Sequence, residues 1–278
     1  MADSNSLTLT VLGSAGAYRT HDGSRASGYL VQRGATTLVL DLGHGTYAPL
    51  AARLGICALP QISAVAISHL HPDHWVDLAA LRHALVHGNK LGRDARSVSV
   101  ISPSGLATRL ATLLDDRTPE EQAVGAHEPL QPFAFSTWRS DAVLPPLGGG
   151  RIVAVGDLTI RSARVRHTGE SYALRVANGD APGLTYSGDV SHWEDLAAIV
   201  RSGDTLLCEA AGGATQWREG DTHVTAYGAG KAAASAGAVK LLLTHFGAEV
   251  DPVEAVRAAG TEFSGEIVAV REGDRFEI

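Results

Sequence analysis

The sequence predicts an α/β protein in which residues 1–278 form one continuous domain. Short aliphatic and β-branched runs, typical of buried strands, alternate with helical stretches from one end of the chain to the other. No Pro/Ser-rich linker or block of charge interrupts this alternation. Hydrophobic residues make up 45% of the chain and charged residues 19%, a composition that supports a buried core and excludes a disordered or coiled-coil chain.

The first half opens with three strand-like runs joined by turns that contain glycine. These runs cover residues 7–12, 28–33 and 37–41 and predict a meander. A helix is expected at 47–54 and a buried strand at 64–68. A second helix is expected at 76–86, because its apolar residues recur at helical spacing.

The second half repeats the alternation with a different sequence. Strands are expected at residues 152–155, 158–165, 173–176, 184–187, 205–208, 239–243 and 267–270. Helices are expected at residues 193–200, 224–236 and 252–259. The interval 88–150 contains many prolines and a run of three glycines, so we expect irregular chain that forms a lid or a substrate wall.

Charge and cysteine content exclude several classes of protein. The formal net charge of −7 argues against a long nucleic acid as partner, because such binding needs many Lys and Arg side chains. Cys57 and Cys208 lie far apart in apolar surroundings, so we expect buried free thiols and neither disulfides nor a thiolate zinc site. Neither a signal-peptide pattern nor a membrane-spanning apolar run is present, which favours a cytoplasmic protein without a membrane partner.

The strongest chemical signal is the sequence SHLHPDH, which begins at the end of a predicted strand. It places three imidazoles and one carboxylate within six residues, and its proline keeps the preceding residue out of a helix. A chain that leaves a strand in this way can turn His69 and His71 to one side and Asp73 and His74 to the other. One loop could therefore hold two metal ions.

Three further candidate ligands follow predicted strands elsewhere in the chain. They are His167, Asp189 and His245. Open α/β sheets place their ligand sites at strand ends. Each residue alone is more often structural, but together with the histidine-rich loop they favour a metal site.

This pattern resembles the metallo-β-lactamase superfamily, whose HxHxDH motif is matched by the histidine-rich loop. The resemblance extends over nearly the whole chain, from TVLGSAG through LDLGHGT to LLLTHF. It implies a four-layer αββα sandwich, with two mixed sheets flanked by helices. It also implies that His69, His71 and His167 bind one ion, that Asp73, His74 and His245 bind a second, and that Asp189 bridges them.

A finer resemblance is to the phosphodiesterase branch that includes ribonuclease Z and cyclic-nucleotide phosphodiesterases. The segment DTHVTAYGAGKAAASAGAVKLLLTHF supplies His223 and Thr225 for the HxT motif of that branch, and LLCEA supplies Glu209. The resemblance implies that His223 donates a proton to the leaving alkoxide and that Glu209 orients it. Asp73 could hold or accept the proton of the attacking water through its second oxygen.

We therefore expect a dinuclear-metal hydrolase of small phosphodiesters, with a cyclic nucleotide such as cAMP as the leading substrate class. Carboxylate and imidazole ligands favour zinc and also suit manganese or iron. Paired ions lower the pKa of a bridging water and neutralise phosphoryl oxygens. The resemblance also makes a homodimer a reasonable expectation.

Other functions of the same site stay open. Ribonuclease Z activity on precursor tRNA is the main alternative, although the interval between His167 and Asp189 is too short for the arm that those enzymes use to clamp tRNA. A lactone or thioester hydrolase is a second alternative, and a binding module without turnover is a third.

Several residues carry weaker signals. The candidate substrate contacts are His44, His192, Ser14 and Ser171. His83 and His87 lie four residues apart on a predicted helix, and we expect them on its polar face rather than at a metal. His21 and His127 receive no role.

Overall fold

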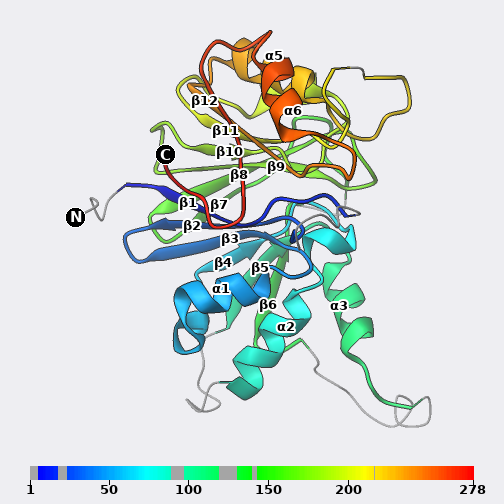
Figure 1. Cartoon of the computed structure of the whole chain (residues 1–278). Helices are drawn as coiled ribbons and strands as arrows, with labels where there is room; N and C mark the ends of the chain where they lie inside the picture. Colours follow the sequence, from blue (N-terminus) through cyan, green and yellow to red (C-terminus); the bar gives the residue numbers. More distant parts are fainter. Residues whose placement is uncertain (1–5, 18–23, 89–96, 119–129, 140–142, 216) are drawn as a thin grey trace.

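Two mixed β-sheets face each other at the centre of the molecule, and helices cover the outer face of each (Figure 1). The structure is a computed structural model that describes residues 6–17, 24–88, 97–118, 130–139, 143–215 and 217–278. The predicted α/β class and four-layer αββα arrangement are confirmed. Among the described residues, no helix combines the length and apolar character needed to cross a bilayer.

The first sheet comes from the first half of the chain and is completed by the last strand. Its strands are β1 (Thr8–Gly13), β2 (Gly28–Arg33), β3 (Thr36–Leu42), β4 (Ala64–Ala66), β5 (Val98–Ser102), β6 (Phe133–Thr137) and β14 (Arg275–Glu277). They are ordered β14-β1-β2-β3-β4-β5-β6. Pairing is antiparallel from β14 to β3 and parallel from β3 to β6.

The second sheet comes from the second half and has the same design. Its strands are β7 (Ile152–Val155), β8 (Leu158–Arg164), β9 (Tyr172–Ala177), β10 (Leu184–Tyr186), β11 (Thr205–Glu209), β12 (Lys240–Thr244) and β13 (Glu266–Ala269). Pairing is antiparallel from β7 to β10 and parallel from β10 to β13.

Helices form the two outer layers. In Figure 1, α1 (Tyr47–Leu54), α2 (Leu78–His83) and α3 (Leu106–Leu114) lie below the first sheet, and α5 (Ala226–Ala236) and α6 (Pro252–Ala259) lie above the second. Each layer buries its own apolar cluster against the sheet that it covers. Burial of apolar surface contributes about 25 cal/mol per Å². The packing of the helices therefore stabilises both sheets.

The core between the two sheets is formed by side chains from both halves of the chain. Tyr29 and Leu38 of the first sheet and Leu174 and Leu207 of the second are completely buried there. Trp138, just after β6, is also completely buried, and its Nε1 donates a hydrogen bond of 2.7 Å to the carbonyl of Ile67. This bond anchors the chain immediately before the histidine-rich loop.

The interval 88–150 is more regular than the sequence predicted. It contains β5, α3 and β6, which extend the first sheet by two parallel strands. The density of proline and glycine in the interval masked the periodicity of these short elements. Parts of this interval, at 89–96, 119–129 and 140–142, lie outside the described residues.

Three smaller expectations also need correction. The helix expected at 193–200 is a 3₁₀ helix, η5 (Trp193–Ala198), closed by a bond from Ile199 N to the carbonyl of Leu196. The helix expected at 76–86 begins at Leu78 and ends in a π-helical turn, η4 (Ala84–Gly88). Strand β14 was not expected, because only one of its residues is apolar.

One of the two cysteines is not where the sequence predicted. Cys208 is buried, but Cys57 is exposed. Cys57 lies near the start of the 3₁₀ helix η2 (Ile56–Gln61). Leu59 and Ile62, at and after the end of this helix, are buried, whereas Ile56 and Cys57 at its start are exposed.

Candidate metal centre

The histidine-rich loop, residues 68–74, carries four of the candidate ligands. It follows β4, and His71 keeps an extended backbone before Pro72 opens the 3₁₀ turn η3 (Pro72–His74). The turn is packed against Gly43, where an added Cβ would lie 1.8 Å from the carbonyl oxygen of Asp73. Only glycine fits at that position, so the loop is held by a close backbone contact as well as by its ligands.

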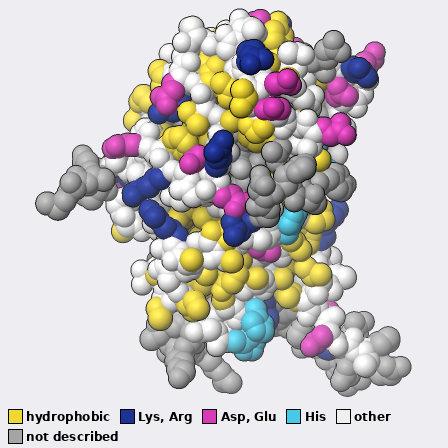
Figure 2. All heavy atoms as spheres, in the orientation of Figure 1, with side chains coloured by type: hydrophobic (Ala, Val, Ile, Leu, Met, Phe, Trp, Pro, Cys, Tyr) yellow, Lys and Arg dark blue, Asp and Glu magenta, His cyan; other side chains and the backbone are white. Residues whose placement is uncertain are grey.

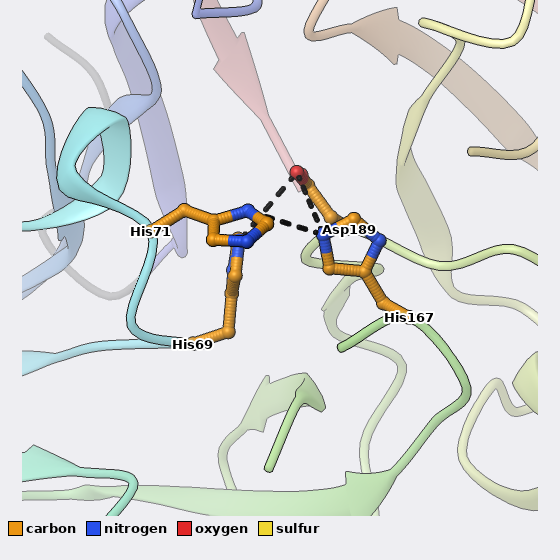
Figure 3. Close-up of side chains that lie close together, drawn as sticks. All are labelled: His69, His71, His167 and Asp189. Carbon is orange, nitrogen blue, oxygen red and sulfur yellow. Dashed lines mark hydrogen bonds and ion pairs between the residues drawn. The ribbon is translucent and has the colours of Figure 1, made fainter. Parts of the chain in front are cut away.

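The first group of side chains joins this loop to two loops of the second sheet. His69, His71, His167 and Asp189 offer ligand atoms that all lie within 4.8 Å of one another. Figure 3 shows the three imidazoles and the carboxylate turned toward a common point. His69 Nε2 and His167 Nε2 lie 3.6 and 3.7 Å from Asp189 Oδ2.

The second group also adjoins the Asp189 carboxylate. It consists of Asp73, His74 and His245. His245 Nε2 is 3.3 Å from Asp189 Oδ2, and His74 Nε2 is 3.4 Å from Asp189 Oδ1. Asp189 therefore contacts both groups, as a bridging ligand must. The structure brings together all seven ligand candidates that the sequence indicated.

Hydrogen bonds on the far side of the imidazoles fix which nitrogen faces the centre. The Nδ1 of His167 donates to the carbonyl of Thr222 at 2.7 Å. The Nδ1 of His245 lies 2.8 Å from Ser27 Oγ, and the Nδ1 of His69 lies 3.1 Å from Ser68 Oγ. With Nδ1 engaged in this way, each of these three imidazoles directs its Nε2 toward the centre.

Three of the atoms that face the centre lack a hydrogen-bond partner in the described parts of the chain. His69 Nε2, His74 Nε2 and Asp189 Oδ1 are buried, and no hydrogen bond reaches them within the described parts of the chain. Burial and the neighbouring His74 hold the pKa of His69 well below its usual range, so its imidazole is neutral. Imidazole nitrogens that converge on carboxylates fit divalent metal ions.

Asp41 holds residues of the centre by hydrogen bonds, and the sequence did not indicate it as a site residue. Its completely buried carboxylate accepts hydrogen bonds from His74 Nδ1 (2.7 Å), Ser68 Oγ (2.7 Å), the Ser68 backbone N–H (2.7 Å) and Tyr186 OH (2.8 Å). Its φ of 53° is unusual for a residue other than glycine. The sequence feature that could have indicated Asp41 is a single aspartate within an otherwise largely apolar strand.

His223 and Glu209 form a pair beside the centre. Both carboxylate oxygens of Glu209 lie 3.0 Å from His223 Nδ1. Burial lowers the pKa of His223, but the adjacent Glu209 charge more than compensates and raises the pKa to about 9. His223 Nδ1 also lies 3.8 Å from Asp189 Oδ2, so the pair adjoins the Asp189 carboxylate.

Five of the seven candidate ligands line an open pocket of about 730 Å³, and His69 and His74 are not among its lining residues. His44 and His223 also line it, and the role of His44 as a substrate contact stays a prediction. Ser14, Ser171 and His192 are not among the described residues that line it. Ser171 Oγ instead donates to the carbonyl of Thr168 at 2.6 Å.

The remaining histidines lie away from the pocket or outside the described residues. His83 and His87 are exposed on the outer surface of α2 and η4, with ring centroids 4.6 Å apart, as expected for a polar helix face. His21 and His127 lie outside the described residues.

Comparison with known proteins relates most of the chain to metal-dependent hydrolases. An uncharacterized protein of Mycobacterium tuberculosis is 31% identical over 98% of this chain and 93% of its own length. The probable metallo-hydrolase YhfI of Bacillus subtilis is 27% identical over 96% of this chain and 98% of its own. Its crystal structure matches 98% of this chain and 100% of its own with a TM-score of 0.81 at 24% identity.

A more distant relative is the mitochondrial ribonuclease Z 2 of Schizosaccharomyces pombe. It is 28% identical over 86% of this chain, which corresponds to 34% of the yeast protein. A family model described as the beta-lactamase superfamily domain matches residues 36–246, which include all seven candidate ligands. The chain therefore belongs to the beta-lactamase superfamily and is one of its metal-dependent hydrolases, related to ribonuclease Z.

Proposed function

We propose that this protein is a dinuclear-metal phosphodiesterase that hydrolyses a small phosphodiester, with a cyclic nucleotide such as cAMP as the favoured substrate. The observation that carries the proposal is the pair Glu209–His223 beside the candidate metal centre. An alkoxide leaving group needs a proton, and a histidine held in its charged form by a carboxylate can donate one.

The ligands proposed for the metal ions are the seven side chains of the two groups. His69, His71 and His167 would hold one ion, Asp73, His74 and His245 the other, and Asp189 would bridge them. When bound, two divalent ions supply Lewis acidity and a more acidic water for attack on phosphorus. Nitrogen and oxygen ligands without thiolate favour zinc and also accept manganese or iron.

The chain's own side chains divide the proton transfers between them. Asp73 Oδ2 lies 3.5 Å from His74 Nε2, and Asp73 is the carboxylate proposed to accept the proton of the attacking water. His223 is proposed to protonate the leaving oxygen, with Glu209 stabilising its charged form. His44, on the wall of the same pocket, is proposed to contact the substrate.

The size and charge of the site favour a small substrate. A pocket of about 730 Å³ lies within the range of about 300–1,000 Å³ typical of small-molecule sites. On the face drawn in Figure 2, the described Lys and Arg side chains are scattered among Asp and Glu. Such a surface offers no continuous track of positive charge for a polyanion.

Precursor tRNA is the second candidate substrate, because a relative is a ribonuclease Z. The segment between His167 and Asp189 argues against it in this chain. Strands β9 and β10 lie in that segment and pair antiparallel with each other, and only residues 178–183 join them. An RNA-binding arm has no room there.

Two substrates separate the roles of the metal ligands and of His223. Bis(p-nitrophenyl) phosphate releases a stable phenolate, whereas cAMP releases an alkoxide. We expect metal-loaded protein to hydrolyse both and His71→Ala to hydrolyse neither. His223→Ala should lose about 10²–10⁴-fold on cAMP while keeping most activity on the phenyl ester.

The controls address the competing functions. His83→Ala changes an exposed histidine remote from the pocket and should leave both rates unchanged. Efficient, correctly placed cleavage of precursor tRNA, or lactone turnover that exceeds phosphodiester turnover and ignores His223, would replace the proposal by the corresponding alternative.

A further inference from the structure

A second cavity, of about 290 Å³, lies beside α5, and four of the described residues that line it carry aromatic rings. Its ring-bearing residues are His192, Trp193, Trp217 and Tyr227. The rings of His192 and Trp217 meet edge to face with centroids 5.0 Å apart, and the Trp217 side chain is 40% exposed. A partly exposed indole at the mouth of a ring-lined cavity is a surface on which a planar base can stack.

Two charged side chains of opposite sign line the same cavity. Lys231 Nζ lies 4.8 Å from the ring centroid of Tyr227 and 5.8 Å from that of Trp193. Within the described parts of the chain, no carboxylate forms an ion pair with Lys231. Glu194, which is exposed, also contributes to the lining. The cavity thus combines aromatic faces with one cation for an anionic group and one carboxylate that can accept hydrogen bonds.

We propose that this cavity is a second ligand site that binds a nucleoside monophosphate whose base carries an exocyclic amino group. The base stacks on Trp217, its amino group donates to the Glu194 carboxylate, and its phosphate contacts Lys231. The volume is at the low end for a small-molecule site, which suits a mononucleotide and excludes larger ligands.

The cavity is built on the segments that carry the proposed catalytic groups. Trp217 lies on the loop between β11, which ends at Glu209, and α5, and this loop leads to His223 (Figure 1). Backbone hydrogen bonds tie the two sides of the loop together, from Gly212 N to the carbonyl of Val224 (3.0 Å) and from Tyr227 N to the carbonyl of Ala214 (2.9 Å).

A nucleotide in the cavity would therefore stiffen the loop that positions His223 against Glu209. We expect occupancy to change kcat, because the same loop carries His223, the proposed proton donor. This effect on turnover rests on the proposed function, whereas binding in the cavity does not.

The binding test uses calorimetric titration of the metal-loaded full-length protein with AMP. Trp217→Ala and Lys231→Ala should each weaken this binding about tenfold or more, while His71→Ala, which damages only the metal centre, should retain it. Lys240→Ala is the matched control, because Lys240 pairs with Glu266 on the second sheet away from the cavity. Inosine monophosphate, which lacks the amino group, should bind wild-type protein more weakly than AMP does. Glu194→Ala, which removes the acceptor, should bind the two nucleotides equally.

The outcomes separate the second site from the first. Loss of AMP binding in His71→Ala with no effect of Trp217→Ala would place the nucleotide at the metal centre and overturn the proposal. Ribose 5-phosphate binding as tightly as AMP would also overturn it, because the rings would then contribute nothing. If AMP binds as expected but cAMP is not hydrolysed, the second site stands and the proposed phosphodiesterase activity fails.

Discussion

At the scale of single residues, the centre depends on side chains that touch its ligands from behind. Asp41 is the clearest case, because one carboxylate holds His74, both polar groups of Ser68 and the hydroxyl of Tyr186. Its negative charge keeps the proton of His74 on Nδ1 and leaves Nε2 directed at the centre. Asp41 is therefore a positioning residue for the metal ligands.

Asp41→Asn should weaken metal affinity by about 10–100-fold. The amide cannot accept all the hydrogen bonds that the carboxylate accepts, so His74 loses its fixed orientation. Asp204→Asn is a matched control, because Asp204 is also completely buried but pairs with Arg175 in the second sheet. Titration with a competing chelator measures the affinity. Equal losses in both variants would show that Asp41 acts only through general stability.

His223 should titrate near pH 9 in the metal-free protein. Glu209 raises its pKa from the usual 6.5, so the imidazole is charged at neutral pH and ready to donate a proton. The charged pair stabilises the fold fully below pH 6.5, and this contribution is lost as the pH rises through about 9. NMR titration of the imidazole protons measures the midpoint.

Glu209→Gln provides the comparison for that titration. Without the carboxylate charge, burial dominates and the midpoint of His223 should fall to 6.5 or below. A midpoint near 9 that survives in Glu209→Gln would show that another group holds the proton.

At the scale of elements, the centre forms where strands end. β4 leads into the histidine-rich loop, β8 into His167, β10 into Asp189 and β12 into His245. Because the sheets bring these strand ends together, residues far apart in sequence meet in one pocket. Gly188 is part of this arrangement, because its φ of +57° turns the chain sharply before Asp189.

Gly188→Ala should impair metal binding and lower stability more than Gly179→Ala does. Both glycines have nearly the same positive φ, +57° and +58°, so both substitutions carry a similar backbone cost of about 1–2 kcal/mol. At Gly188, however, a Cβ would also lie 2.7 Å from the carbonyl oxygen of Tyr172, whereas at Gly179 nothing lies within 4 Å.

Thermal unfolding and bound metal per chain measure the difference between these two variants. Identical melting temperatures and identical metal contents would show that the close contact at Gly188 does not position Asp189.

The same strand ends explain what the sequence could and could not predict. The ligands were predictable because each follows a recognisable apolar run, and the structure gathers them as expected. Asp41 was not predictable in this way, since it lies inside β3 and acts on a loop that is distant in sequence. Strands β5 and β6 were missed because glycine and proline around them obscured short periodic runs. Tertiary pairing, rather than local sequence, establishes such elements.

At the scale of the whole molecule, the net charge of the chain and the charge of the centre have opposite signs when two divalent ions are bound. The chain carries a formal net charge of −7, yet a centre with two divalent ions would be locally positive. This contrast suits a small phosphodiester that enters the pocket and disfavours a long polyanion spread over the surface. The expectation of a homodimer stays a prediction.

The central claim is that a two-ion centre drives phosphodiester hydrolysis. The most direct measurement is the rate of cAMP hydrolysis as a function of bound metal per chain, in protein stripped by chelator and then reloaded stepwise with zinc or manganese. We expect no turnover in the stripped protein and a rate that reaches its maximum at two ions per chain. Full activity after removal of metal, or no hydrolysis of cAMP with two ions bound, would contradict the account.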